Sequence, residues 1–199
     1  MSDPFVIDTA RVRRSFGRSA DAYDVAAVLQ AKVREELLGR LDLVRLEPVA
    51  VLDLGAGTGH ASLALKRRYP SSRVVALDLA EGMLRSARRR QTLLRRFARV
   101  CADASALPLR DASVDLVFSN LMLQWCNNPD RVLRECRRVL RPGGLLTFAT
   151  LGPDTLIELR RAWAAADGHV HVNRFIDMHD LGDALVRSGL AEPVMDVER

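Results

Sequence analysis

The stretch VLDLGAGTGH, residues 51–60, decides the fold. An apolar run that reads as a strand leads directly into three glycines, Gly55, Gly57 and Gly59. Glycines permit the positive φ values and the close backbone approach that a turn around a ligand requires. The dinucleotide-binding fingerprint is GxGxxG, but here the third glycine comes one residue early and His60 stands where the fingerprint has glycine. We therefore expect a ligand-binding loop of a different kind.

Strand-like and helix-like patterns alternate along the chain on both sides of this loop. Helical apolar spacing is present in residues 23–41 and 129–140, and Thr155 with Glu158 fits a capping box that opens a helix running to Asp167–Gly168. Strands are expected at residues 49–55, 73–79, 99–103, 114–120 and 145–151, with a possible last strand at 193–198; further helices are expected at 59–68, 81–97 and 180–188. The alternation predicts an α/β fold with a mainly parallel sheet. In such sheets, ligands bind at the carboxyl ends of the strands.

Acidic residues stand at the ends of three predicted strands. Asp53 precedes the first glycine by two residues, where a carboxylate would repel a pyrophosphate but could pair with an ammonium group. Asp78 could accept hydrogen bonds from ribose hydroxyls, and Asp103 could reach an adenine amino group. Each aspartate alone could be a turn or helix cap. Together with the glycines, they predict a binding site for S-adenosylmethionine.

These residues resemble those of the class I S-adenosylmethionine-dependent methyltransferases. The resemblance runs from about Val49 to Leu151 and includes RVLRPGG before the fifth strand. It implies a Rossmann-like sheet and a set of cofactor contacts: Asp53, Gly55, Ala56, Gly57, Asp78, Leu79, Met83, Asp103, Ala104 and Asn120.

A closer resemblance extends beyond this shared core. The segments RRSFGRSADAYDVAAVLQ (13–30), SNLMLQWCNNPD (119–130), TLGPDTLIELRRAW (150–163) and HVNRF (171–175) are similar to the malonyl-acyl carrier protein O-methyltransferases of biotin synthesis. The resemblance implies methyl transfer to the free carboxylate of a malonyl thioester, with acyl carrier protein as partner. One domain is then expected over residues 1–199, comprising a helical cap (1–47), a cofactor-binding core (48–152) and an acceptor-side segment (153–199).

The stretch SNLMLQWC, residues 119–126, is apolar where a chain leaving a strand usually turns polar. A sulfonium and an attacking carboxylate both lose charge in the transition state, so excluding water favours the reaction. Leu121, Leu123 and Trp125 could form a dry wall, with Gln124 and Phe175 as further acceptor contacts. The alternative is that these are ordinary core residues, and both interpretations can hold.

A carboxylate acceptor is already ionised at pH 7, so no general base is required. The site must instead hold the carboxylate in line with the methyl group. Tyr23 is the first candidate donor, followed by His171 and Arg174. Tyr23 could alternatively brace the cap, and Arg174 could be a surface residue. His171 with His169 suggests metal spacing, but no cysteine or carboxylate constellation accompanies them, so no metal site is expected.

Composition is that of a soluble globular protein, with 48% hydrophobic and 28% charged residues. No apolar run approaches the ~18 to 20 residues of a membrane helix, and the N-terminus, MSDPFVID, lacks a signal pattern. The three cysteines form no CxxC pair, which favours a reducing cytoplasm.

The net charge is +5, and only 2 of the 30 basic residues are lysines. Seven arginines cluster in one segment: Arg85, Arg88, Arg89, Arg90, Arg95, Arg96 and Arg99. The cluster could be a solvated helix face or a docking face for an acidic partner. Nucleic acid is not expected, because few aromatic residues interleave with the arginines.

The resemblance is incomplete at the C-terminus. Family members run well past 200 residues, so a truncated chain that lacks C-terminal strands is expected. Three rival functions remain: a methyltransferase of another small molecule, a protein arginine hydroxylase of respiratory complex assembly, and a non-catalytic assembly factor.

Overall fold

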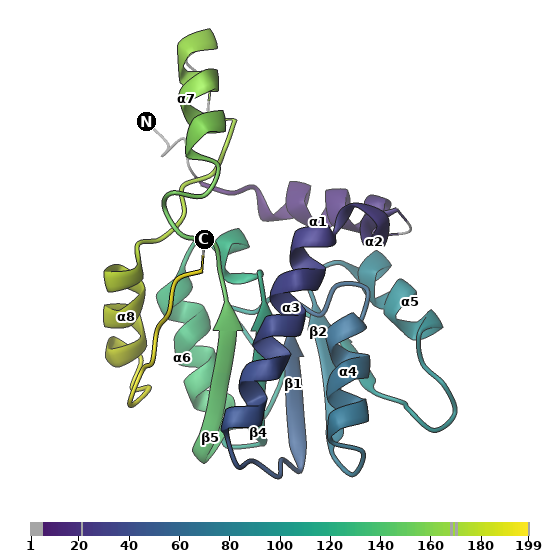
Figure 1. The fold of residues 1–199 in the computed structure, drawn as a ribbon. Helices are drawn as coiled ribbons and strands as arrows, with labels where there is room; N and C mark the ends of the chain where they lie inside the picture. The colour runs from purple at the N-terminus through teal and green to yellow at the C-terminus, as the bar shows by residue number, and fades with distance from the viewer. Residues whose placement is uncertain (1–5, 21, 168, 170, 199) are drawn as a thin grey trace.

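The computed structural model describes residues 6–20, 22–167, 169 and 171–198. Five strands form one parallel sheet in the order β3-β2-β1-β4-β5 (Figure 1). The strands are β1 (Ala50–Leu54), β2 (Arg73–Asp78), β3 (Ala98–Cys101), β4 (Val114–Asn120) and β5 (Leu140–Ala149). The predicted α/β fold with a parallel sheet is confirmed.

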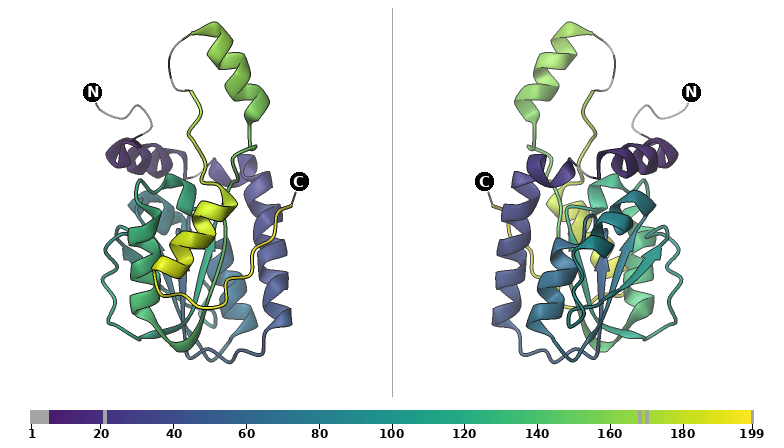
Figure 2. Two further views of the ribbon diagram at one scale, coloured as in Figure 1. Left: turned by 90° about the vertical axis from the view of Figure 1, so that its left-hand side faces the viewer. Right: turned by 90° about the vertical axis from the view of Figure 1, so that its right-hand side faces the viewer.

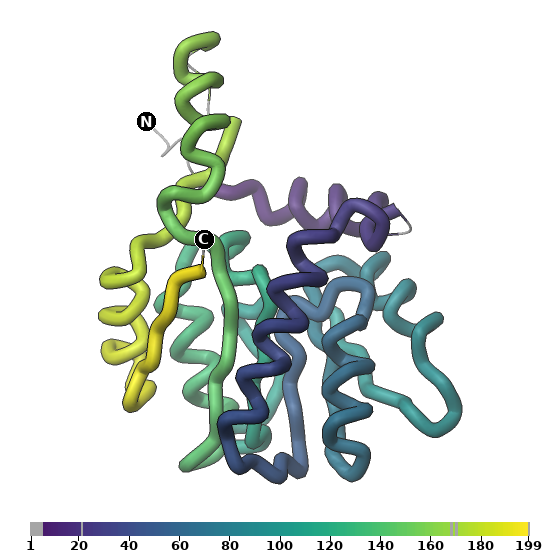
Figure 3. Tube along the Cα trace, in the orientation of Figure 1, coloured from purple at the N-terminus to yellow at the C-terminus, as the bar shows by residue number. Residues whose placement is uncertain are grey.

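Helices cover both faces of this sheet. Those of the chain are α1 (Thr9–Ser19), α2 (Tyr23–Ala26), α3 (Val28–Arg40), η1 (Leu41–Leu43), α4 (His60–Arg68), α5 (Glu81–Arg89), η2 (Leu123–Trp125), α6 (Pro129–Val139), α7 (Ile157–Ala166) and α8 (Met178–Arg187). The views in Figure 2 show α3 and α4 on one side of the sheet, and α6 and α8 on the other. Helix α1 crosses above the carboxyl ends of the strands, while α7 projects away from the body, as the tube in Figure 3 also shows.

The strands are apolar on both faces because both faces are covered. Val51 packs with residues of α3, α4 and α5, whereas its neighbour Leu52 packs with residues of α6 and α8. In β4, Phe118 belongs to the first cluster and Val117 to the second. The period of two along each strand therefore divides one sheet between two hydrophobic cores.

Two predicted helices are shorter in the structure. The helix expected at 23–41 is interrupted at Ala27, whose ψ of 43° lies outside the helical range. The helix expected at 81–97 ends at Arg89. Beyond it, Phe97 turns into the core while Leu93 and Leu94 are exposed, so the segment lacks the one-sided apolar stripe of a helix.

Two further predictions, the capping box of α7 and the last strand, are wrong. Helix α7 begins after Leu156, which has a positive φ, and no side chain caps it; the amide of Thr155 instead donates to the carbonyl of Gly152 in a turn. Residues 193–198 form no strand, and the side chains of Asp196 and Glu198 pair with Arg40. Gly168, the expected end of the α7 helix, lies outside the described residues.

Strand β5 also begins earlier in the sequence than expected. Strand β5 starts at Leu140 and includes the Pro-Gly-Gly stretch 142–144, which we expected to separate helix from strand. Among the described residues, no helix is both long enough and apolar enough to cross a membrane.

Asp53 is a buried carboxyl group in the centre of the sheet. Its side chain is 1% exposed and accepts a 2.5 Å hydrogen bond from the Ser62 hydroxyl on α4. Burial raises the pKa of Asp53 to about 7, and the bond from Ser62 offsets only part of that rise. The position follows from strand alternation, because Asp53 shares its face of β1 with Val51, on the side of α4.

We expect Asp53 to make the protein less stable as the pH rises. The folded-state pKa lies above the unfolded one, so the advantage of the protonated form is complete at about pH 4 and lost as the pH rises to about 7. The expected loss is at most about 4 kcal/mol, at about 1.4 kcal/mol per pH unit. Denaturant unfolding at pH 5 and pH 7.5 checks this.

The Asp53→Asn variant is the matched control, because the amide cannot ionise but can still accept from Ser62. Its unfolding free energy, relative to that of the natural protein, should rise by about 1 to 3 kcal/mol between the two pH values. Equal pH dependence of both proteins would show that Asp53 is already ionised in the fold at pH 5.

Candidate active site

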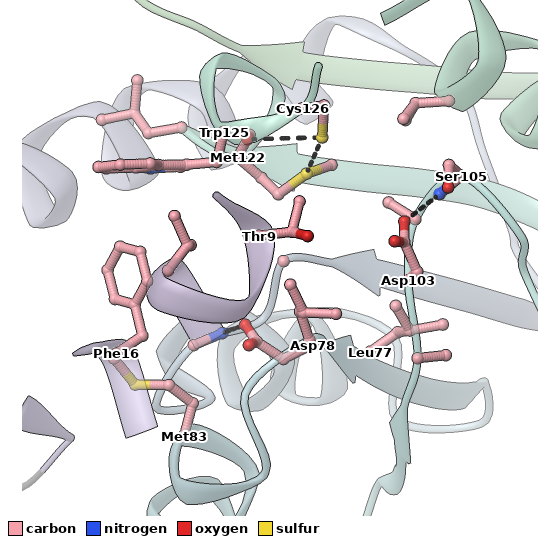
Figure 4. A pocket seen from close by; sticks show the side chains of 18 of the residues that line it. Thr9, Phe16, Leu77, Asp78, Met83, Asp103, Ser105, Met122, Trp125 and Cys126 are labelled. Carbon is pink, nitrogen blue, oxygen red and sulfur yellow. Dashed lines mark hydrogen bonds between the residues drawn. The ribbon is translucent and has the colours of Figure 1, made fainter. Parts of the chain in front are cut away.

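A cavity of about 300 Å³ lies at the carboxyl ends of β1, β2 and β4. Its floor comes from the glycine loop and from the ends of β2 and β4, while its cover comes from α1 and α2. Figure 4 shows Thr9 and Phe16 of α1 facing Asp78, Asp103 and Trp125 across the space. This is the edge of the sheet at which the sequence predicts ligand binding.

The glycine loop has a backbone conformation that residues with side chains would not easily adopt. Gly55 has a φ of +76°, and a Cβ built there would lie 2.3 Å from Cγ of Met122. The amides of Gly55 and Ala56 both donate to the carbonyl of Leu77, which ties the loop to β2. Gly57, with a φ of +54°, lines the cavity with open space beside it. The loop thus gives a ligand access to the backbone.

Asp78 is fixed at the end of β2 by two backbone amides. Gly57 donates to Oδ2 and Ala80 donates to Oδ1, each at 2.8 Å. Burial raises the pKa of Asp78, while these two bonds oppose the rise. Each carboxylate oxygen can accept more than one hydrogen bond. Asp78 can therefore receive donors from a ligand without losing its place.

Asn120, at the end of β4, also lines the cavity. Asn120 donates through Nδ2 to the carbonyl of Gln30, and this assigns its Oδ1 to the other side. Oδ1 is buried and has no hydrogen-bond partner in the structure. A buried acceptor without a partner is unfavourable, but an oxygen so shielded from solvent does not itself face the cavity that the residue lines.

The turn after β4 forms the apolar part of the lining. Leu121 has a φ of +51°, uncommon for a residue with a side chain and typical of functional sites. Leu121, Met122 and Trp125 line the cavity, whereas Leu123 is buried in the core. The core interpretation therefore holds for Leu123, while the dry-wall interpretation stays a prediction for Leu121 and Trp125.

Helix α1 contributes an aromatic contact that the sequence analysis missed. The Phe16 ring lies edge-on to Trp125, with centroids 5.2 Å apart, and edge-on to Tyr23 at 6.0 Å. The signal was the single aromatic in RRSFGRS, between arginines. The polar residues among the others that were missed come from loops or helix starts: Thr9, Ser105, Asn127, Asn128 and Arg131.

Tyr23 lines the cavity from the start of α2. Burial raises the pKa of its phenol, and the nearby charges of Asp78 and Asp24 raise it further. The hydroxyl therefore stays protonated at neutral pH and can donate a hydrogen bond.

Most of the predicted cofactor contacts come together in this cavity. The residues that line it are Gly55, Gly57, Asp78, Leu79, Met83, Asp103, Ala104 and Asn120. Asp53 and Ala56 do not: Asp53 points to Ser62 within the fold, and Ala56 is buried behind the loop. The ammonium pairing expected for Asp53 is replaced by an internal hydrogen bond.

The predicted acceptor residues are only partly brought together. Trp125, Leu121 and Tyr23 line the cavity, whereas Gln124 donates to the carbonyl of Leu121 and accepts from Thr150 outside it.

The segment after α7 lies outside the lining as well, and with it His171, Arg174 and Phe175. The His171 ring stacks on Trp163 at 4.0 Å and contacts Asp167 at 2.9 Å, beside the projecting helix. The acceptor role expected for these residues is not part of the site assembled here. No group of three metal-ligating side chains occurs among the residues that the structure describes.

Comparison with known proteins identifies the relatives of this chain. A methyltransferase domain family matches residues 52–148. The malonyl-acyl carrier protein O-methyltransferase of Methylovorus sp. strain MP688 is 58% identical to this chain, and the alignment covers 99% of this chain and 69% of that protein. That of Laribacter hongkongensis is 57% identical, with coverages of 100% and 70%.

Solved structures share the fold. A chain in the complex of the Haloferax volcanii Trm112 methyltransferase activator with a methyltransferase superposes with a TM-score of 0.72 at 23% identity, covering 87% of this chain and 75% of its own. An S-adenosylmethionine-dependent methyltransferase from Mesorhizobium loti gives 0.61 at 27% identity, with coverages of 76% and 79%.

Because a methyltransferase domain family matches residues 52–148 and relatives of 57–58% identity match 99–100% of this chain, the chain belongs to the malonyl-acyl carrier protein O-methyltransferase family of S-adenosylmethionine-dependent methyltransferases.

Proposed function

We propose that this chain methylates the free carboxylate of a malonyl group carried by acyl carrier protein, as the names of its relatives indicate for them. The product is the malonyl methyl ester, and the role implied by the resemblance is in biotin synthesis. One structural observation supports the proposal most strongly: a single cavity joins an acidic end, with Asp78 and Asp103, to an apolar and aromatic end, with Phe16 and Trp125.

The acidic end suits S-adenosylmethionine. Asp78 can accept from the ribose hydroxyls, since both of its oxygens are already oriented by backbone amides. Asn120 lines this end as well, but its side chain would have to turn for its unpaired, buried oxygen to reach the ammonium group. Asp103 can accept from the adenine amino group, beside Ala104. When bound, the cofactor supplies an activated methyl group on a sulfonium.

The aromatic end suits a carboxylate acceptor. The carboxylate is ionised at neutral pH and attacks without a base. Tyr23 can donate to it and hold it in line, because its raised pKa keeps the phenol protonated. Leu121, Met122 and Trp125 exclude water, which would otherwise stabilise the separated charges more than the transition state. His171 and Arg174 would have to move to contribute.

An acidic protein partner is favoured by the outer surface of α1. Thr9, Val12 and Phe16 face the cavity, whereas Arg11, Arg14 and Arg18 are displaced by roughly half a turn, at 100° per residue. None of these three guanidinium groups has a partner among the described residues, and α1 contains no acidic residue. The excess positive charge thus lies at the mouth of the cavity. An acidic carrier protein whose arm enters the cavity would meet this surface.

Replacing Tyr23 tests the donor role. In Tyr23→Phe, the rate of methyl gain on malonyl-acyl carrier protein, followed by mass spectrometry, should fall by about 10- to 100-fold, because one hydrogen bond to a charged group is lost. Cofactor affinity, measured by calorimetry, should change less than about threefold on the same reasoning.

The matched control is Tyr69→Phe. The hydroxyl of Tyr69, the chain's other tyrosine, accepts a hydrogen bond from Arg68 away from the cavity, so the methylation rate of the Tyr69→Phe variant should be unchanged. Full activity of Tyr23→Phe would exclude Tyr23 as the donor. If the natural protein adds no methyl and instead adds 16 mass units to an arginine of a partner, the arginine hydroxylase alternative is correct.

Reversing the charge of α1 tests the docking surface. In Arg11→Glu/Arg14→Glu/Arg18→Glu, KM for malonyl-acyl carrier protein should rise about tenfold or more, through lost electrostatic attraction. KM for the malonyl thioester of N-acetylcysteamine, which carries neither protein nor phosphate, should be unchanged.

Arg67→Glu/Arg73→Glu is the control, because both residues are exposed near the opposite end of the sheet, where β2 begins. Equal increases for both thioesters would assign the arginines to the cavity rather than to the carrier. Unchanged KM for both would remove α1 as a docking surface. Competition by RNA that the triple variant abolishes would indicate a nucleic acid partner instead.

A further inference from the structure

Asp24 joins the N-terminal cap to the glycine loop. The Thr58 hydroxyl donates to its Oδ1 at 2.6 Å, and Nε2 of His60 lies 3.3 Å from the same oxygen. Arg90 donates to Oδ2 through its terminal nitrogen, and its Nε donates to the carbonyl of Thr58 at 2.8 Å. One carboxylate of α2 thus contacts the loop, the first residue of α4 and the C-terminal end of α5.

The charge balance of this cluster rests on Asp24 and Arg90. Burial lowers the pKa of His60, and the charge of Arg90 lowers it further, so the ring is neutral at pH 7. Asp24 and Arg90 are each about one-third exposed, at 32% and 29%. Because the pair is only partly exposed, water competes with it only in part. Removing the Asp24 carboxylate would leave Thr58 and Arg90 without the acceptor that they share.

The other end of the cap is tied by a second contact. The amide of Ile7 donates to Oδ1 of Asn127 at 2.8 Å, and Nδ2 of Asn127 donates to the carbonyl of Ile7 at 2.9 Å. Asn127 itself lines the cavity. The two ties therefore lie at opposite ends of the α1–α2 segment.

Between these ties, the cap is held by a small apolar contact. Its fully buried members are Ala20, Ala80 and Met83, with Phe16 and Tyr23 packed against them. Helix α1 can approach α5 because Gly82 has no side chain. A Cβ on Gly82 would lie 2.4 Å from the carbonyl oxygen of Gly17. Three buried side chains stabilise the cap much less than the main cores stabilise the sheet. The polar ties therefore add to this contact, and to the contact of Phe16 with Trp125, in fixing where the cap lies.

We propose that Asp24 is a positioning residue: by holding Thr58, His60 and Arg90, it fixes α2 and its neighbour Tyr23 over the cofactor cavity, and with Asn127 it keeps the cap closed. Asp24 does not line the cavity. It acts through the residue beside it and through the loop below it. The cap must release its ties for the cofactor to exchange. The inference rests on the proposed function only in that the cavity binds S-adenosylmethionine.

The test measures cofactor binding and cap motion in the absence of any acceptor. Asp24→Ala should raise the cofactor dissociation rate constant about tenfold, followed by stopped-flow fluorescence of Trp125 at the cavity. Amide hydrogen exchange in α1 and α2 should accelerate, while exchange in β1 and β4 and the Tm stay as in the natural protein. Asp24→Asn and Thr58→Val remove fewer contacts of the cluster. They should therefore give smaller increases in the cofactor dissociation rate constant and in amide exchange of α1 and α2.

Asp42→Ala is the control, because Asp42 also pairs with an arginine, Arg68 at 2.6 Å, but at a more exposed position outside the cavity lining. It should leave dissociation and exchange unchanged. Dissociation and exchange in Asp24→Ala equal to those of the control would overturn the proposal. If Asp24→Ala fails to fold, the same two outcomes for Thr58→Val decide. Failure of the natural protein to bind cofactor would overturn the proposed function itself, whatever the variants do.

Discussion

The structure depends on the contact between the glycine loop and the turn after β4. Gly55 and Met122 approach so closely that no side chain fits at residue 55. This contact brings the loop after β1 beside the apolar turn, so the acidic and aromatic ends of the cavity share one wall. A parallel sheet makes this possible, because every strand ends at the same edge and contributes its next few residues there.

Much of the fold could be predicted because its signals are local. Strand β4 matches the expected residues 114–120, and the helix before β5 was placed within one residue. The errors occurred where distant contacts override local preference. Residues 90–97 are arginine-rich and could continue a helix, but the helix ends at Arg89, and Phe97 is buried in the core while Leu93 and Leu94 are exposed. The 193–198 segment has strand composition, yet its backbone pairs with no other strand, and its carboxylates pair with Arg40.

The candidate site divides in the same way. Asp78 follows from its place at a strand end. Asp53 has the same sequence signal, but strand alternation and the facing Ser62 direct it inward, and residue spacing alone cannot report a hydroxyl on a helix. Phe16 had only a weak signal, the single aromatic residue in RRSFGRS, and Asn127 had none, because the contacts of both depend on where α1 lies. Tyr23 was identified through a family resemblance, and only the structure relates it to Phe16 and Asp78.

Carboxyl methylation explains why the cap is built with so little apolar contact. The reaction joins two opposite charges into a neutral ester, so it gains from a dry site, but both reactants must enter from water. A cap held by a large hydrophobic contact would exclude water well and open slowly. A cap held by Asp24 and Asn127 can exchange each hydrogen bond for one to water as it opens, at a net difference of about 1 kcal/mol each. Polar ties thus reconcile exclusion of water during the reaction with entry and release between turnovers.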